Sequence, residues 1–98
     1  MQLDILKYLS NRKEGDILVD LREREIFNFG TIAGAINIPL GEIQKLYDLP
    51  KDSKIYLFCQ SGDLSGEIAE LLSDAGYSAC NLLGGFRKYL ANSNIVKG

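Results

Sequence analysis

The sequence predicts a single α/β domain in which a parallel β-sheet is covered by helices on both faces. Short apolar segments rich in β-favouring residues, such as 17–19 and 55–58, alternate along the chain with segments of helical periodicity. That alternation is typical of a parallel sheet. Both segments are apolar at every position, as in strands buried on two faces. The length of 98 residues is that of one domain, so residues 1–98 are expected to form a single unit.

In the first half of the chain, capping and breaking residues mark the ends of the expected elements. Asp4 is a candidate N-cap, Gly30 a helix stop and Pro39 a strand end. The expected elements are a helix that begins after Asp4, a strand over 17–19, a helix over 24–29, a strand over 35–38 and a helix over 42–47.

In the second half, the apolar segment 55–58 runs directly into Cys59. A helix with apolar residues at three- and four-residue spacing follows the next loop and is expected to end at Gly76. The remaining expected elements are a strand over 78–82, a tight turn at Gly84-Gly85, a helix over 86–91 and a frayed tail over 92–98.

Composition excludes several classes of function. A net charge of -2 gives no basic face for nucleic acid, and no apolar run reaches membrane-spanning length. The N-terminus lacks the pattern of a signal peptide, so the protein is expected to be cytoplasmic. The two cysteines form neither a disulfide framework nor a C-x-x-C motif. The absence of histidine removes Ser-His-Asp hydrolases, Cys-His proteases and the usual zinc sites.

Cys59 stands where the strand over 55–58 ends and a helix begins. The loop that follows contains Gly62. Loop amides and the positive end of the helix dipole can both point at the sulfur, which favours the reactive thiolate. Asp20 follows another expected strand, and ligands in such folds bind beyond the carboxyl ends of strands. The residues alone therefore predict a cysteine-centred site for an anion or for sulfur.

Four short motifs, in order and at matching spacing, resemble the rhodanese-like domain family. They are Val19-Asp20-Leu21-Arg22-Glu23, Gly34-Ala35-Ile36-Asn37-Ile38-Pro39-Leu40, Cys59-Gln60-Ser61-Gly62 and Leu83-Gly84-Gly85-Phe86. Together they cover nearly the whole chain. The resemblance implies a three-layer fold with a mostly parallel sheet of four to five strands and helices on both faces. Residues 1–3 would form its first edge strand.

The resemblance also implies transfer of sulfane sulfur from thiosulfate or a persulfide donor to a thiol or cyanide acceptor. The expected partners are a small sulfur donor and a thiol acceptor, including a protein thiol, and no cofactor or metal is expected. Cys59 matches the nucleophile that becomes a persulfide. Asp20 and Arg22 match a family motif and are expected either to brace the loop or to line the pocket. The persulfide-binding loop corresponds to Gln60, Ser61, Gly62, Asp63, Leu64 and Ser65.

The loop departs from active family members, which often carry arginine at its second and last positions. Gln60 and Leu64 stand there, and Asp63 adds an acid that is a candidate to cap the helix. Helix-end placement contributes roughly 0.3–1 kcal/mol, and about 1.4 kcal/mol is needed to shift a pKa by one unit. Helix-end placement alone therefore lowers the thiol pKa by about one unit or less, and the loop has no cation to attract the thiosulfate dianion. For these two reasons the sequence predicts slow use of thiosulfate and faster use of a less charged persulfide. Arg87 and Lys88 are candidates for an extra cation.

Alternatives remain for the function of the chain and for the roles of individual residues. A catalytically weak binding or regulatory module with a protein partner is the alternative function, because the loop has no cation. Dual-specificity phosphatases and arsenate reductases of related architecture need a longer loop closed by arginine, whereas Ser65 stands six residues after Cys59. Cys80 is expected in the core, with a disulfide to Cys59 as the alternative if their strands are neighbours. Ser61 and Ser65 are expected to be local caps rather than nucleophiles.

Overall fold

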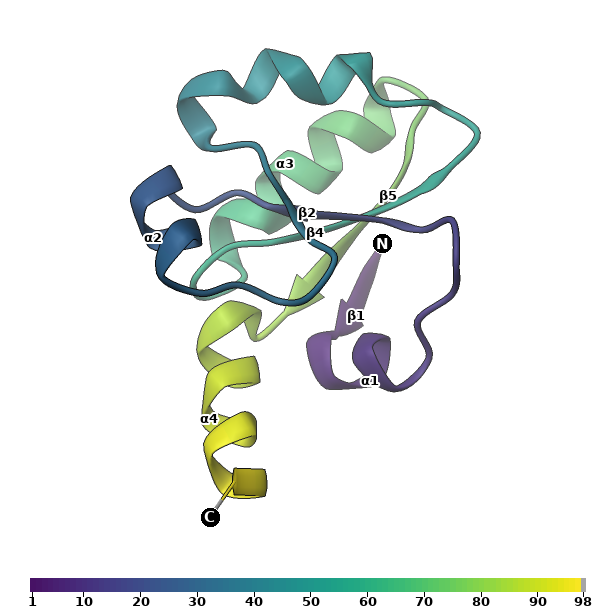
Figure 1. Ribbon diagram of the computed structural model, residues 1–98. Helices are drawn as coiled ribbons and strands as arrows, with labels where there is room; N and C mark the ends of the chain where they lie inside the picture. The colour runs from purple at the N-terminus through teal and green to yellow at the C-terminus, as the bar shows by residue number, and fades with distance from the viewer. Residues whose placement is uncertain (98) are drawn as a thin grey trace.

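The computed structural model describes the backbone of residues 1–97 and the side chains of residues 1–92 (Figure 1). Strands alternate with helices along the chain, as the sequence predicts. The elements are β1 (Gln2–Asp4), α1 (Ile5–Ser10), β2 (Ile17–Asp20), α2 (Arg24–Phe29), β3 (Ile36–Asn37), the 3₁₀ helix η1 (Leu40–Asp48), β4 (Lys54–Phe58), α3 (Asp63–Asp74), β5 (Ser78–Leu83) and α4 (Gly85–Lys97).

The sheet has five strands in the order β1-β5-β4-β2-β3, and every neighbouring pair is parallel. The predicted parallel sheet is confirmed, and the N-terminal edge strand forms as β1. The chain passes from β4 outward to β5 but from β2 outward to β3, in the opposite direction. The adjacent strands β2 and β4 therefore flank the point where the topology switches, which is where open α/β sheets bind ligands.

Helices cover both faces of the sheet, as predicted (Figure 1). Leu46 of η1 and Leu72 of α3 belong to the core cluster on one face. Tyr8 of α1 and Phe86 of α4 belong to the cluster on the other face. Consecutive residues of β4 contribute to opposite clusters. This two-sided burial is the reason why β4 is apolar at every position from Ile55 to Phe58.

Three expected elements differ most from the structure, and the other expected bounds lie within two residues of those observed. The last helix, expected over 86–91 with a frayed tail, instead runs from Gly85 to Lys97, and Gly98 lies outside the described residues. The helix expected over 42–47 is a 3₁₀ helix spanning Leu40–Asp48, with an irregular turn at Glu42. The strand expected over 35–38 is reduced to Ile36–Asn37. Within residues 1–97, no helix combines the length and hydrophobicity needed to cross a membrane.

The first turn of α4 lies directly against the loop that joins β4 to α3. The backbone N–H of Phe86 donates to the carbonyl oxygen of Cys59 at 2.9 Å, and that of Arg87 donates to the carbonyl oxygen of Gln60 at 3.0 Å. Gly85 permits this approach, because it has φ +60° and a Cβ there would lie 2.6 Å from the Cys59 carbonyl oxygen. The start of α4 thus keeps the carbonyl groups of Cys59 and Gln60 directed toward α4.

We expect Gly85→Ala to lower the melting temperature by at least about 4 °C. A left-handed backbone costs an L-residue roughly 1–2 kcal/mol, and about 1 kcal/mol shifts the melting temperature by about 4–8 °C in a domain of this size. Gly41→Ala is the matched control, since its Cβ would meet nothing within 4 Å. Thermal melts followed by circular dichroism measure both variants. Equal melting temperatures for the two would contradict the assigned role of Gly85.

Candidate functional site

The candidate site lies at the carboxyl ends of β2 and β4. Asp20, the last residue of β2, is paired in register with Phe58, the last residue of β4. Cys59 follows Phe58 directly, and α3 begins four residues later at Asp63. The parallel pairing therefore brings two sequence motifs, separated by nearly forty residues, to one edge of the sheet. This edge coincides with the topological switch between β2 and β4.

The Cys59 sulfur is held by hydrogen bonds from the loop that follows it. Sγ accepts from the backbone N–H of Gly62 at 3.1 Å and of Ser65 at 3.4 Å. The Ser65 hydroxyl oxygen lies 3.3 Å from Sγ. Gly62 adopts φ +101°, and a Cβ there would lie 3.2 Å from the backbone nitrogen of Gly84. Glycine is therefore required to turn the loop amides inward.

These contacts lower the pKa of the Cys59 thiol even though the side chain is buried. Burial raises that pKa, because desolvation disfavours the thiolate. Hydrogen bonds from the side chain and backbone of Ser65, and from the backbones of Gly62 and Ser61, outweigh burial and place the pKa below its ordinary value. Sγ also lies at the N-terminus of the twelve-residue helix α3, where the helix dipole favours an anion.

A pocket of about 400 Å³ opens onto Cys59. Its polar lining comes from Arg22, Glu23, Gln60 and Ser61. Its apolar lining comes from Leu21, Ile26, Leu40 and Leu64. The cysteine is thus only 5% exposed yet faces a space large enough for a small organic thiol.

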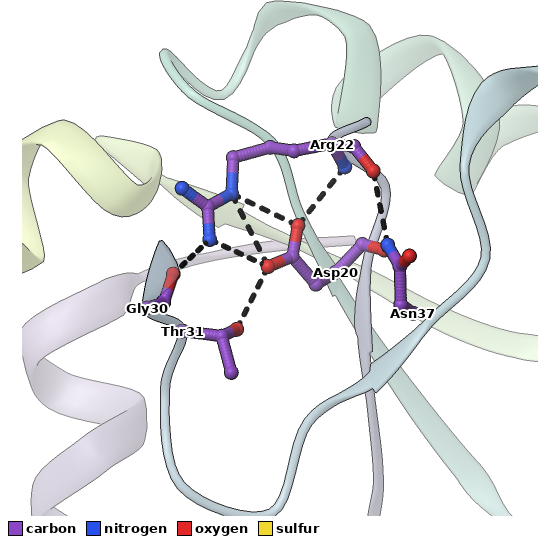
Figure 2. A network of polar contacts seen from close by, with 5 residues as sticks. All are labelled: Asp20, Arg22, Gly30, Thr31 and Asn37. Carbon is purple, nitrogen blue, oxygen red and sulfur yellow. Dashed lines mark hydrogen bonds and ion pairs between the residues drawn. The ribbon is translucent and has the colours of Figure 1, made fainter. Parts of the chain in front are cut away.

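Asp20 and Arg22 form a buried ion pair that joins β2 to the segment after α2 (Figure 2). Arg22 Nη2 donates to Asp20 Oδ2 at 2.7 Å and to the carbonyl oxygen of Gly30 at 2.7 Å. Thr31 Oγ1 donates to the same carboxylate oxygen at 2.7 Å. Asn37 Nδ2 donates to the carbonyl oxygens of Asp20 and Arg22 at 3.0 and 2.9 Å. The network therefore holds in place the backbone of residues 20–22, where the chain leaves the sheet at the end of β2.

Of the two motif residues, Arg22 lines the pocket and Asp20 does not. Asp20 is fully buried behind it. The Arg22 guanidinium carbon also lies 3.8 Å from the centre of the Phe86 ring, which clamps the planar group between carboxylate and aromatic face. Both alternatives considered for this motif therefore apply to Arg22, which braces the loop and forms part of the pocket wall.

Three expectations about side chains near the site are wrong. Asp63 does not cap α3, because Gly62 is the N-cap residue and the Asp63 carboxylate accepts no N–H there. The backbone N–H of Asp63 instead donates to Ser61 Oγ at 3.3 Å, so Ser61 is a local cap as expected. Ser65 is no local cap, because its hydroxyl contacts Cys59 and Asn81. Lys88 supplies no charge to the loop, since it pairs with Asp4. The alternative of a disulfide between Cys59 and Cys80 is also ruled out in this fold.

Cys80 lies on the strand next to β4, but its register keeps it away from Cys59. It is paired with Tyr56, three residues before Cys59. At about 3.3 Å per strand residue, the two cysteines are separated by about 10 Å along the sheet. Disulfide Cα atoms usually lie about 4.4–6.8 Å apart. Both cysteines are free thiols, and Cys80 is a buried core residue as expected.

The sequence analysis missed Asn81, a buried amide behind the loop. Its Oδ1 accepts from the Ser65 hydroxyl at 2.5 Å, and its Nδ2 donates to the Gly62 carbonyl oxygen at 3.0 Å. The available signal was a polar side chain in the middle of an apolar strand, since a buried amide requires partners. Among the described residues, no three His, Cys, Asp or Glu side chains lie close enough together to hold a metal ion.

Comparison with known proteins supplies the family. Residues 4–92 match the family model of the rhodanese-like domain. Over 74 residues the chain is 40% identical to the uncharacterized protein YqhL of Bacillus subtilis, covering 74% of this chain. It spans 59% of YqhL, less than two thirds of that protein's length.

Two further relatives are covered more fully. Over 89 residues the chain is 35% identical to the thiosulfate:glutathione sulfurtransferase of Homo sapiens, covering 74% of this chain and 77% of that protein. A rhodanese-related protein from Thermoplasma volcanium superposes with a TM-score of 0.85 at 28% identity, covering 93% of this chain and 91% of the other. With its motifs, its sheet topology and these matches in agreement, the chain belongs to the rhodanese-like domain family.

Proposed function

We propose that the chain is a sulfurtransferase that carries a sulfane sulfur as a persulfide on Cys59. The observation that supports this proposal most strongly is the setting of Sγ, which faces a pocket and accepts two backbone N–H groups at the start of α3. Those donors stabilise a sulfur anion without a histidine, a metal or a cofactor. The name of the human relative, thiosulfate:glutathione sulfurtransferase, supports the same class of reaction.

The proposed reaction has two displacement steps at sulfur. First, the Cys59 thiolate attacks the outer sulfur of the donor, and a new S–S bond forms at Sγ. The donor's own S–S bond breaks, and its electron pair leaves on sulfite or on the thiolate of a persulfide donor. Second, the thiolate of the acceptor attacks the outer sulfur of the Cys59 persulfide. The electron pair of that bond returns to Sγ, and the acceptor leaves as a persulfide.

The rest of the loop is suited to holding the outer sulfur of the persulfide. The backbone N–H groups of Gln60 and Leu64 donate to no protein atom within the described residues. Both residues line the pocket that opens onto Sγ. Amides left unpaired at the start of a helix are favourable donors to an anion. They support the assignment of residues 60–65 as the persulfide-binding loop.

The charges around the pocket favour a donor with little negative charge. The guanidinium of Arg22 is already paired with the Asp20 carboxylate. Glu23 lines the pocket, and the exposed Asp63 adds a further negative charge at the start of α3. The remaining walls are largely apolar. We therefore propose that an organic persulfide is a better donor than the thiosulfate dianion, and that a thiol, including one on a protein, is the acceptor.

The pH dependence of alkylation tests the predicted state of Cys59. Its lowered pKa means that the thiolate forms at a lower pH than in an ordinary thiol, so the half-maximal rate should be reached at a lower pH than in a free-cysteine peptide labelled under the same conditions. Burial raises the pKa of Cys80, which should stay unmodified over the same range. Iodoacetamide labelling with peptide mapping separates the two sites. A half-maximum at or above the free-cysteine value would contradict the prediction.

Intact-mass spectrometry tests the function itself. We expect wild-type protein to gain one sulfur atom from a small organic persulfide, more slowly from thiosulfate, and Cys59→Ser to gain none. Cys80→Ser is the matched control and should behave as wild type, because Cys80 lies away from the pocket. If folded, reduced wild-type protein gains sulfur from neither donor, the alternative of a binding module with a protein partner is favoured.

Leu64→Arg tests why thiosulfate should be a poor donor. Leu64 lines the pocket, so an arginine there would place a cation near the bound dianion. We expect loading from thiosulfate to accelerate about threefold to tenfold, because an ion pair at a partly exposed position contributes about 1 kcal/mol. Loading from an uncharged persulfide should change little, and added salt should reduce the gain. Leu64→Gln is the neutral control, and an equal gain in that variant would refute the electrostatic explanation.

A further inference from the structure

A buried hydrogen-bond network contacts the Cys59 sulfur through residues that do not line the pocket. Its centre is Asn81 of β5, which is only 2% exposed. The side chain of Asn81 bridges the Gly62 carbonyl oxygen and the Ser65 hydroxyl, and Ser65 in turn contacts Sγ. Gly66 leaves room for this amide, because a Cβ there would lie 3.1 Å from Nδ2. Asn81 thus reaches the sulfur only through Ser65 and the loop.

The direction of each hydrogen bond in this network follows from its donors and acceptors. A backbone carbonyl can only accept, so the group 3.0 Å from the Gly62 oxygen must be the Asn81 NH₂. Oδ1 therefore faces Ser65 and can only accept, which assigns the single hydroxyl proton of Ser65 to Asn81. A lone pair of Ser65 Oγ is then directed at Sγ, where it accepts from the S–H of the neutral thiol at 3.3 Å.

This arrangement cannot persist unchanged when Cys59 loses its proton. A thiolate has no hydrogen to donate, and the Ser65 lone pair facing it would be repelled. The hydroxyl can turn and donate to the sulfur only by leaving Asn81 Oδ1, which is then buried without a donor. In the persulfide, Sγ is again uncharged, so the hydroxyl proton returns to Asn81. One proton is therefore shared between two acceptors according to the charge on Sγ.

We propose that Asn81 is a positioning residue that competes with the Cys59 sulfur for the Ser65 hydroxyl proton and thereby limits how far the thiolate is stabilised. The role of this competition in catalysis rests on the proposed sulfurtransferase function, but the competition itself does not. It keeps the thiolate basic enough to remain a strong nucleophile, because nucleophilicity falls as the thiol pKa falls. It also gives the sulfur a donor at the moment when the acceptor step returns charge to Sγ.

A double-mutant cycle on the pKa of Cys59 tests the proposal. We expect Asn81→Leu, which removes the acceptor at similar volume, to raise the thiolate-to-thiol ratio about tenfold at a given pH relative to the same change made in a Ser65→Ala background. That is a difference of about one pKa unit for one freed hydrogen bond. A merely structural role, through the Gly62 carbonyl, would change the pKa equally in both backgrounds, and that outcome would overturn the proposal.

A second measurement avoids any variant at Asn81. In wild-type protein, the side-chain amide resonance of Asn81 should shift with pH at the same midpoint as Cys59, since deprotonation withdraws its Ser65 partner. In Ser65→Ala the shift should vanish. If the Asn81 side-chain resonance of the wild-type protein does not shift at the Cys59 midpoint, the proposal is overturned. Neither measurement uses a sulfur donor, so failure of persulfide formation in the mass-spectrometry test stays distinguishable from failure here.

Discussion

The hydrogen bonds from the first turn of α4 to the carbonyl oxygens of Cys59 and Gln60 are the constraint on which the site depends. Because these carbonyls are bound to α4, the loop can direct amides of Gly62 and Ser65 at the sulfur. The position of α4 depends in turn on the core on the far face of the sheet, where Phe86 packs. The candidate active site is therefore stabilised from the layer opposite to the helix that follows the cysteine.

The buried ion pair of Asp20 and Arg22 also affects the electrostatics of the pocket. A buried carboxylate needs compensating charge and hydrogen bonds, and Asp20 receives them from the guanidinium and from Thr31. The same contacts leave Arg22 with little net field to offer a ligand, although it lines the pocket. A cation visible in the sequence therefore does not replace the arginines that the loop lacks. An arginine thus lines the pocket, but its charge is already paired with Asp20.

Whether Arg22 is paired or free is one of the features that the sequence alone could not predict. Apolar segments predicted the sheet because two-sided burial imposes that pattern, and the position of Cys59 between strand and helix followed from local periodicity. Asn81 was missed because its partners, Ser65 and Gly62, lie 16 and 19 residues away along the chain. The capping role expected for Asp63 failed because Gly62, with φ +101°, already occupies the N-cap. Local patterns predict elements, whereas side-chain partners depend on register.

The chemistry of the site then rests on neutral groups. Among the described residues, the polar groups that contact Sγ are two backbone amides and the Ser65 hydroxyl, and none of them is titratable. Backbone amide dipoles keep their orientation and strength across pH, and neutral donors are screened by salt far less than surface charges. Within this neutral setting, the Ser65 hydroxyl is the one described group at Sγ that can rotate, so it can turn as the charge on the sulfur changes in the proposed reaction.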